Sequence, residues 1–120
     1  MKNLSLIFFL IFIVNFDSYC QEHIFTKNIS KSINAKNKEL IIDAEKANIH
    51  IESTAGENFI IDINFISKHQ QKTTSEHQLS YLKHVINTKA KEVYIRNYIV
   101  LDEEDELTGS ILTEYALQIP

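Results

Sequence analysis

Three histidines lie in the middle of the sequence, and imidazole is the commonest transition-metal ligand in proteins. His77 and His84 are seven residues apart and would share one face of a helix, and His69 lies just before them. Zinc sites usually place two ligands within one helical turn or in a tight hairpin. We therefore interpret these three as polar surface histidines and predict no metal site. His50 alternates with isoleucines and is expected to face solvent.

Asp102 to Glu106 is a run of five acidic residues, and carboxylate oxygens are ligands that calcium prefers. The run lacks the alternation and the internal glycine of a calcium loop, so we predict a solvated hairpin tip that keeps a strand edge from associating. Asp62, Glu52 and Glu114 are single acids at outward strand positions. No carboxylate pair for glycoside cleavage can be assigned from them.

Nucleophilic catalysis needs a Ser, Thr or Cys beside a base, usually at a tight turn or a helix start. The only glycines, Gly56 and Gly109, are isolated, and no Gly-x-Ser-x-Gly motif occurs. A phosphate-binding loop needs clustered glycines and is also absent from the sequence. The sequence therefore predicts no catalytic residue and no cofactor.

Tyr94, Arg96 and Tyr98 alternate along one apolar segment and would share a strand face. Such a face either binds a partner or forms a half-buried second layer on the sheet, and we favour the second layer.

Most of the chain must form strands to position these residues. In 39–54, Leu40, Ile42 and Ala44 alternate with outward positions, and Ile49 and Ile51 do the same, which predicts two short strands joined near 45–47. In the next strand, over 59–66, the inward face is formed by Phe59, Ile61, Ile63 and Phe65.

One short helix is expected near 75–84, after a polar loop over 67–74. Thr73 to Glu76 and Ser75 to Gln78 both have capping-box spacing, and apolar residues follow at helical intervals. A strand over 83–88 is an alternative for the end of this helix.

Two further strands are predicted over 93–101 and 111–119. In the last one, the inward face consists of Ile111, Thr113, Tyr115, Leu117 and Ile119. Residues 21–38 form either a leader or an edge strand. No strand–helix–strand repeat occurs, so the fold class is all-β with one short helix, over a domain at 39–120.

Residues 1–20 have the pattern of a secretory signal peptide. Lys2 precedes an apolar run over 4–14, which is too short to cross a membrane as a helix. Ser18 and Cys20 are small residues suited to cleavage before Gln21. The alternative, lipidation of Cys20, fits less well because Tyr19 and Asp17 precede it.

The composition is that of an ordinary folded domain and not of a disordered segment. The chain has 120 residues, is 44% hydrophobic and has a formal net charge of −4, which disfavours nucleic acid and anionic membranes as partners. Cys20 is its only cysteine, so the core must hold the domain together without a disulfide framework.

Three segments resemble a family of adhesin-like bacterial envelope proteins: Leu40 to Ser53, Lys91 to Asn97, and Tyr115 to Pro120. The resemblance implies short strands stacked as in a β-solenoid, an exported protein and no established catalytic residues. The corner at 46–48 lacks the usual glycine, and the chain stops where the family's repeats would begin, as a truncated chain would.

We therefore expect an exported, non-catalytic β-rich envelope protein in the periplasm, on the outer surface or secreted. It would have an adhesin-like or structural role and an unidentified protein or cell-surface partner, with association through a strand edge. The alternative is a small periplasmic carrier whose sheet and helix enclose an apolar ligand.

Overall fold

The computed structural model describes residues 22–102 and 106–120, and the proposed signal peptide with Cys20 and Gln21 lies outside them. The strands are β1 (His23–Asn34), β2 (Glu39–Asp43), β3 (Ala47–Ser53), β4 (Asn58–His69), β5 (Leu82–Thr88), β6 (Glu92–Ile99) and β7 (Ser110–Ile119). Among these described residues one short helix, α2 (Lys72–Leu79), connects β4 to β5. The fold is all-β with one short helix, as predicted.

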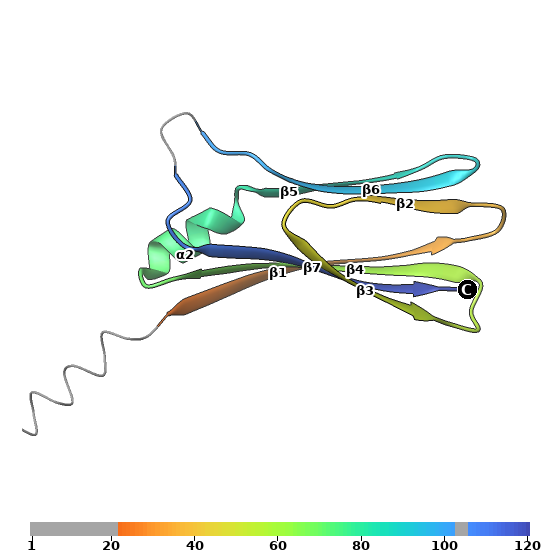
Figure 1. Cartoon of the computed structure of the whole chain (residues 1–120), viewed down its shortest axis with the longest axis horizontal. Coiled ribbons are helices and arrows are strands. Elements are labelled where there is room, and N and C mark those ends of the chain that lie inside the picture. Colours follow the sequence, from red (N-terminus) through yellow and green to blue (C-terminus); the bar gives the residue numbers. More distant parts are fainter. Residues whose placement is uncertain (1–21, 103–105) are drawn as a thin grey trace, which may run out of the picture.

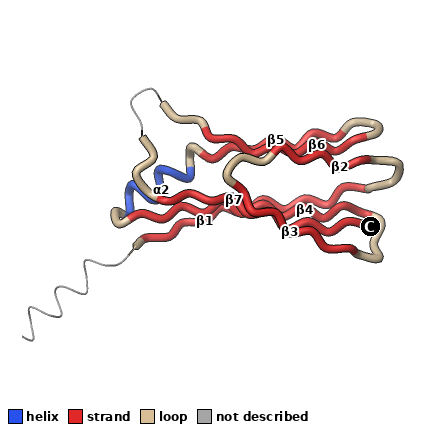
Figure 2. Tube along the Cα trace, viewed as in Figure 1, coloured by secondary structure: helices blue, strands red, loops and turns tan. Residues whose placement is uncertain are grey.

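Two stacked sheets form the body of the molecule (Figures 1 and 2). The four-stranded sheet has the order β1-β4-β7-β3, and the three-stranded sheet has the order β2-β6-β5. The β3–β7 and β2–β6 pairs are parallel, whereas the β1–β4, β4–β7 and β5–β6 pairs are antiparallel. The helix packs against β1 and β4 at one end of the larger sheet.

The core lies between the facing sides of the two sheets, because strand residues alternate between the two faces. Its buried hydrophobic residues are Phe59, Ile61, Ile63 and Phe65 of β4, Leu82 of β5, Val93 and Ile95 of β6, and Tyr115 and Leu117 of β7. The central strands β4, β7 and β6 supply eight of these nine residues, so the strands at the sheet edges contribute little to the core.

The predicted strand faces of β4 and β7 are confirmed. Of the segment 21–38, residues His23–Asn34 form the edge strand β1. β1 pairs with β4 over its whole length, from His23 opposite His69 to Asn34 opposite Asn58. The final strand buries Thr113, Tyr115 and Leu117 on the predicted face. Thus two-residue alternation located the buried faces of β4 and β7 correctly.

The predicted loop over 67–74 and helix over 75–84 are wrong in their bounds. β4 continues to His69 because its ladders with β1 and β7 extend over polar residues. The helix starts at Lys72, and its N-cap Gln71 makes no side-chain capping hydrogen bond, so the predicted capping boxes are not used. The alternative strand over 83–88 is confirmed by β5.

Ile49 and Ile51 of β3 were expected to face the core, but they are 45% and 56% exposed. They lie beside Tyr115 and Leu117 of β7 in a parallel ladder, so their side chains point to the core face of the sheet. The cause of their exposure is the position of β3 at the sheet edge, where the three-stranded sheet does not cover them.

The described residues contain no helix that is long and apolar enough to cross a membrane.

Candidate functional site

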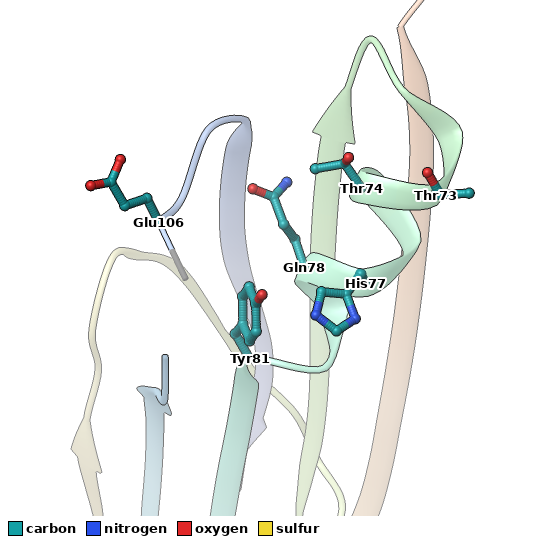
Figure 3. Close-up of a pocket in the computed structure, with 6 residues that line it drawn as sticks. All are labelled: Thr73, Thr74, His77, Gln78, Tyr81 and Glu106. Carbon is teal, nitrogen blue, oxygen red and sulfur yellow. The ribbon is translucent and has the colours of Figure 1, made fainter. Parts of the chain in front are cut away.

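A polar hollow of about 460 Å³ lies where α2 meets the segment that leads into β7. Figure 3 shows the six residues that line it: Thr73, Thr74, His77, Gln78, Tyr81 and Glu106. They come from the helix, from the residue just before β5 and from the approach to β7. Hydroxyl, imidazole and carboxylate groups thus gather in one place, so the hollow has to be weighed as a site of chemistry.

Gln78 is the structural centre of this hollow and is buried. Its Oε1 accepts hydrogen bonds from the backbone N–H groups of Thr108 (3.3 Å) and Gly109 (3.1 Å). Its Nε2 donates to Ser67 Oγ at 3.4 Å. A Cβ at Gly109 would lie 2.3 Å from the Lys68 carbonyl oxygen, so the close approach of this segment requires glycine. Gln78 therefore fixes the entry into β7.

Two further residues of the hollow, Thr74 and His77, also contact structural partners. The hydroxyl of Thr74 donates to Gln71 Oε1 at 3.2 Å, and the ring of His77 packs edge-on against Tyr81 with centroids 5.1 Å apart. A nucleophilic hydroxyl would instead donate to the base that activates it. The hollow therefore has the contacts of a joint between helix and sheet.

The structure does not bring His69, His77 and His84 together as ligands. His69 contacts Thr108 Oγ1 through Nε2 at 3.1 Å and accepts a hydrogen bond from the Gln71 N–H at Nδ1. His84 packs against Phe65 instead, with ring centroids 6.2 Å apart. The described part of the chain contains no group of three His, Cys, Asp or Glu residues that could hold a metal ion.

The pKa of His84 is affected by its surroundings. Burial lowers the pKa of His84 below its ordinary value of 6.5, and the positive charges of Lys27 and Lys31 lower it further. Both lysines belong to the edge strand β1 of the four-stranded sheet, whereas His84 belongs to the edge strand β5 of the three-stranded sheet.

The single acids have local roles. Asp62 Oδ1 accepts a hydrogen bond from Ser30 Oγ at 2.5 Å, and His50 pairs with Glu52 at 3.0 Å on the exposed outer face of β3. Glu114 is exposed, as predicted. Of the acidic run, residues 103–105 lie outside the described residues, so the predicted hairpin tip stays a prediction.

Tyr94, Arg96 and Tyr98 share the outer face of β6. The Tyr94 hydroxyl donates to Asp43 Oδ2 at 3.2 Å, Arg96 Nε lies 3.9 Å from the same oxygen, and the Arg96 guanidinium lies 5.1 Å from the Tyr98 ring centroid. Tyr94 and Tyr98 are half-buried. These contacts agree with the second-layer interpretation.

Asn97 is the most connected polar side chain of the core, and the sequence interpretation missed it. Its Nδ2 donates to the Glu45 carbonyl (2.7 Å) and to Thr113 Oγ1 (3.4 Å), while its Oδ1 accepts from the Glu45 N–H (3.1 Å) and the Tyr115 hydroxyl (2.5 Å). Asn97 follows Val93 and Ile95 at the next inward position of β6, which was the available signal.

This network connects both sheets to the segment between β2 and β3. Burial raises the pKa of Tyr115 to about 12, and the negative charge of Asp43 contributes to the increase. The Tyr115 hydroxyl is therefore a permanent donor to Asn97 near neutral pH, and the crossover at Glu45 is held at a defined position.

The edge strand β3 is the second candidate site. The residues just before and just after β3 in the sequence both form hydrogen bonds to β7, through the Lys46 carbonyl and the Thr54 N–H. Backbone groups alternate in direction along a strand, so the even-numbered residues between them also face β7. The N–H and C=O groups of Ala47, Ile49, Ile51 and Ser53 consequently point to the free edge.

β3 therefore combines two features that usually do not occur together at the surface. Its outward backbone groups face no other strand among the described residues, and the adjacent core-face side chains are Ile49 and Ile51. An edge of this kind is a template for an added strand. Figure 1 shows β3 at the margin of its sheet.

The chain matches no family model, and no curated protein or solved structure matches it. The resemblance to adhesin-like envelope proteins thus stays a prediction.

Proposed function

We propose that this chain is an exported, non-catalytic envelope protein that acts by adhesin-like binding through the β3 edge. The observation that carries this proposal is the pairing of outward backbone groups with the uncovered side chains of Ile49 and Ile51. An added strand would form hydrogen bonds to these backbone groups and would also bury the side chains of Ile49 and Ile51. Large exposed apolar residues that lie side by side favour an interaction surface.

The contacts in the polar hollow support the non-catalytic part of the proposal. Gln78, Thr74 and His77 are engaged with neighbouring residues in ways that hold α2 and the start of β7. Export is supported by the signal-like sequence over 1–20, and an adhesin-like role by the family resemblance. The partner would be a protein or a cell-surface component.

Two measurements test the proposal. Fractionation of the source cells, with an antibody to the chain, is expected to place it in the periplasm, at the outer surface or in the medium. Recovery in the cytoplasm would contradict the export step.

Binding of the labelled, purified protein to intact cells tests the edge. The double variant Ile49→Lys/Ile51→Lys is expected to lose binding at least tenfold, since it places two charges where an added strand would pack. Ile24→Lys is the matched control, because Ile24 is 58% exposed on β1 at the opposite edge of the same sheet. Equal binding by both variants would refute a role for β3.

The carrier alternative has less support. The space between the sheets is filled by the side chains of the core, including Phe65, Ile63 and Ile95, which are fully buried. A co-purified apolar molecule in native mass spectrometry would favour this alternative.

A further inference from the structure

We infer that the strand added at the β3 edge is β3 of a second copy of this chain, paired antiparallel about a two-fold axis at His50. This inference rests on the proposed function, because it names the occupant of the same edge.

The backbone pattern of β3 is complementary to itself. With His50 opposite His50 of the second copy, Ile49 lies opposite Ile51, and Ala47 lies opposite Ser53. All four residues have outward N–H and C=O groups, so each pair exchanges two hydrogen bonds. This register uses all seven residues of β3, whereas shifting it by one pair leaves strand residues unpaired.

The inward side chains are complementary in the same register. Ile49 and Ile51 of one copy would contact Ile51 and Ile49 of the other on the core face. Residues directly opposite each other have Cβ atoms about 4.5–5.5 Å apart, within contact distance for branched side chains. Four isoleucine side chains, each about half exposed in the single chain, would thereby be covered.

Charge favours a second copy over a strongly charged partner. β3 contains one acid, Glu52, and no lysine or arginine, and Glu52 already contacts His50 of its own chain. In the two-fold register Glu52 lies opposite Asn48, so the two carboxylates are separated by about four residues. The strand thus offers a near-neutral surface that does not repel its own copy.

The other edge of the same sheet lacks this complementarity. β1 carries Lys27 and Lys31 on the face that also holds Ile29 and Ile33, which pack against the core. Inward-pointing charges at an edge are a common device against strand addition. Self-pairing through β1 would bring these lysines toward those of the second copy, where like charges repel each other. The β3 edge is therefore the one suited to self-pairing.

Disulfide formation between single-cysteine variants tests the register. All variants carry Cys20→Ser, which removes the only native cysteine. In the proposed register residue 50 faces its own copy in a non-hydrogen-bonded pair, with Cα atoms about 4.5 Å apart, inside the range for a disulfide. His50→Cys is expected to form a covalent dimer on mild oxidation.

Two matched variants make this test specific. Glu52→Cys alone is expected to stay monomeric, because its Cα would lie about 13 Å from residue 52 of the second copy. Asn48→Cys alone should also stay monomeric, whereas a mixture of Asn48→Cys and Glu52→Cys should cross-link. Equal cross-linking of all variants would overturn the register, and no cross-linking of His50→Cys would overturn self-pairing.

Sedimentation equilibrium of the purified chain, without the engineered cysteines, measures the strength of the self-association. We expect a reversible monomer–dimer equilibrium, weakened at least tenfold by Ile51→Lys and by Ile51→Pro. The proline removes an N–H that points to the free edge and spares the ladder to β7. Ile24→Lys should leave the equilibrium unchanged.

The outcomes separate this inference from the proposed function. A chain that is monomeric at all concentrations, but whose binding to cells is lost in Ile49→Lys/Ile51→Lys, overturns self-pairing and keeps the edge as a site for a different protein. A chain that dimerises through His50→Cys but is found in the cytoplasm supports self-pairing and overturns the envelope role.

Discussion

The two edges of the four-stranded sheet differ in what they present to an approaching strand. β1 is twelve residues long and carries the inward-pointing Lys27 and Lys31. β3 is seven residues long and carries Ile49 and Ile51 at the corresponding inward positions. Within the described part of the chain both are edge strands whose outward backbone groups face no other strand, so the difference lies in the side chains. One edge of the sheet is therefore protected by charge, and the other is open.

The two strands are also anchored differently. The start of β3 depends on Asn97, which binds both backbone groups of Glu45 in the preceding crossover. The start of β1 depends on Ser75 of α2, whose hydroxyl lies 2.7 Å from the His23 carbonyl oxygen and 3.0 Å from that of Ser67. Each edge strand is thus positioned by one buried polar side chain from a distant part of the sequence.

Replacing Lys27 and Lys31, the charges that protect the β1 edge, should have the largest effect of all the variants, and this effect is on the size of the assemblies. Lys27→Ile/Lys31→Ile would open the second edge, so copies could pair at both sides of the sheet and form open chains. We expect assemblies larger than dimers, measured by light scattering and by loss of protein from the supernatant on centrifugation.

The control for this variant is Lys36→Ile/Lys72→Ile. It removes the same charge from the turn after β1 and from the first residue of α2, where no strand edge is affected. If both double variants aggregate equally, net charge and not edge protection explains the result.

Loss of the β3 anchor should have the next largest effect. Asn97→Ala removes four hydrogen bonds in the core and leaves buried partners unsatisfied, which we expect to cost about 2–4 kcal/mol of unfolding free energy. Chemical denaturation measures this loss, with the exposed Asn48→Ala as the control. A loss below about 0.5 kcal/mol would show that the crossover into β3 is held by other contacts.

Loss of the β1 anchor should be smaller. Ser75→Ala removes one buried hydroxyl and is expected to cost about 1–2 kcal/mol, with faster amide exchange at the start of β1 and no change in β3. Ser30→Ala, which removes an exposed hydroxyl from β1, is the control. Faster exchange in both edge strands would contradict separate anchoring.

The smallest effect concerns the charges beside His84. Lys27→Gln/Lys31→Gln is expected to raise the pKa of His84 toward 6.5, because two of the three causes of its decrease are removed. Since the folded-state pKa is lowered, the stability contribution of neutral His84 is present above pH 6.5 and is lost as the pH falls through the folded pKa.

NMR titration of the His84 ring measures this change, with Lys36→Gln as the control. An unchanged pKa in the double variant would contradict the prediction that the charges of Lys27 and Lys31 act on His84.

The sequence predicted the positions of the strands better than the burial of their side chains. Two-residue alternation identified the buried faces of β4 and β7, because both strands are central and are covered by the opposite sheet. The same rule gave the correct direction for Ile49 and Ile51 but the wrong burial. Whether an inward side chain is covered depends on the number and order of strands, which local alternation does not encode.

The polar contacts were also beyond local patterns. Asn97 meets Glu45 and Tyr115, which are 52 and 18 residues away in sequence. The helix bounds were missed because Leu82 and Ile86, read at helical spacing, belong to the two-residue pattern of β5. Composition and alternation therefore sufficed for the fold class, and the edge that carries the proposed binding required the topology.

Amide hydrogen exchange, followed by NMR over a range of protein concentrations, tests the open edge most directly. Ala35 N–H bonds to Glu57, so even-numbered residues of β1, such as Asn28 and Ser30, present their amides to the free side of that strand. In dilute protein the amides of Ile49, Ile51, Asn28 and Ser30 should all exchange fast. At high concentration only those of Ile49 and Ile51 should become protected. Protection of the β1 amides instead, or no dependence on concentration, would contradict the account.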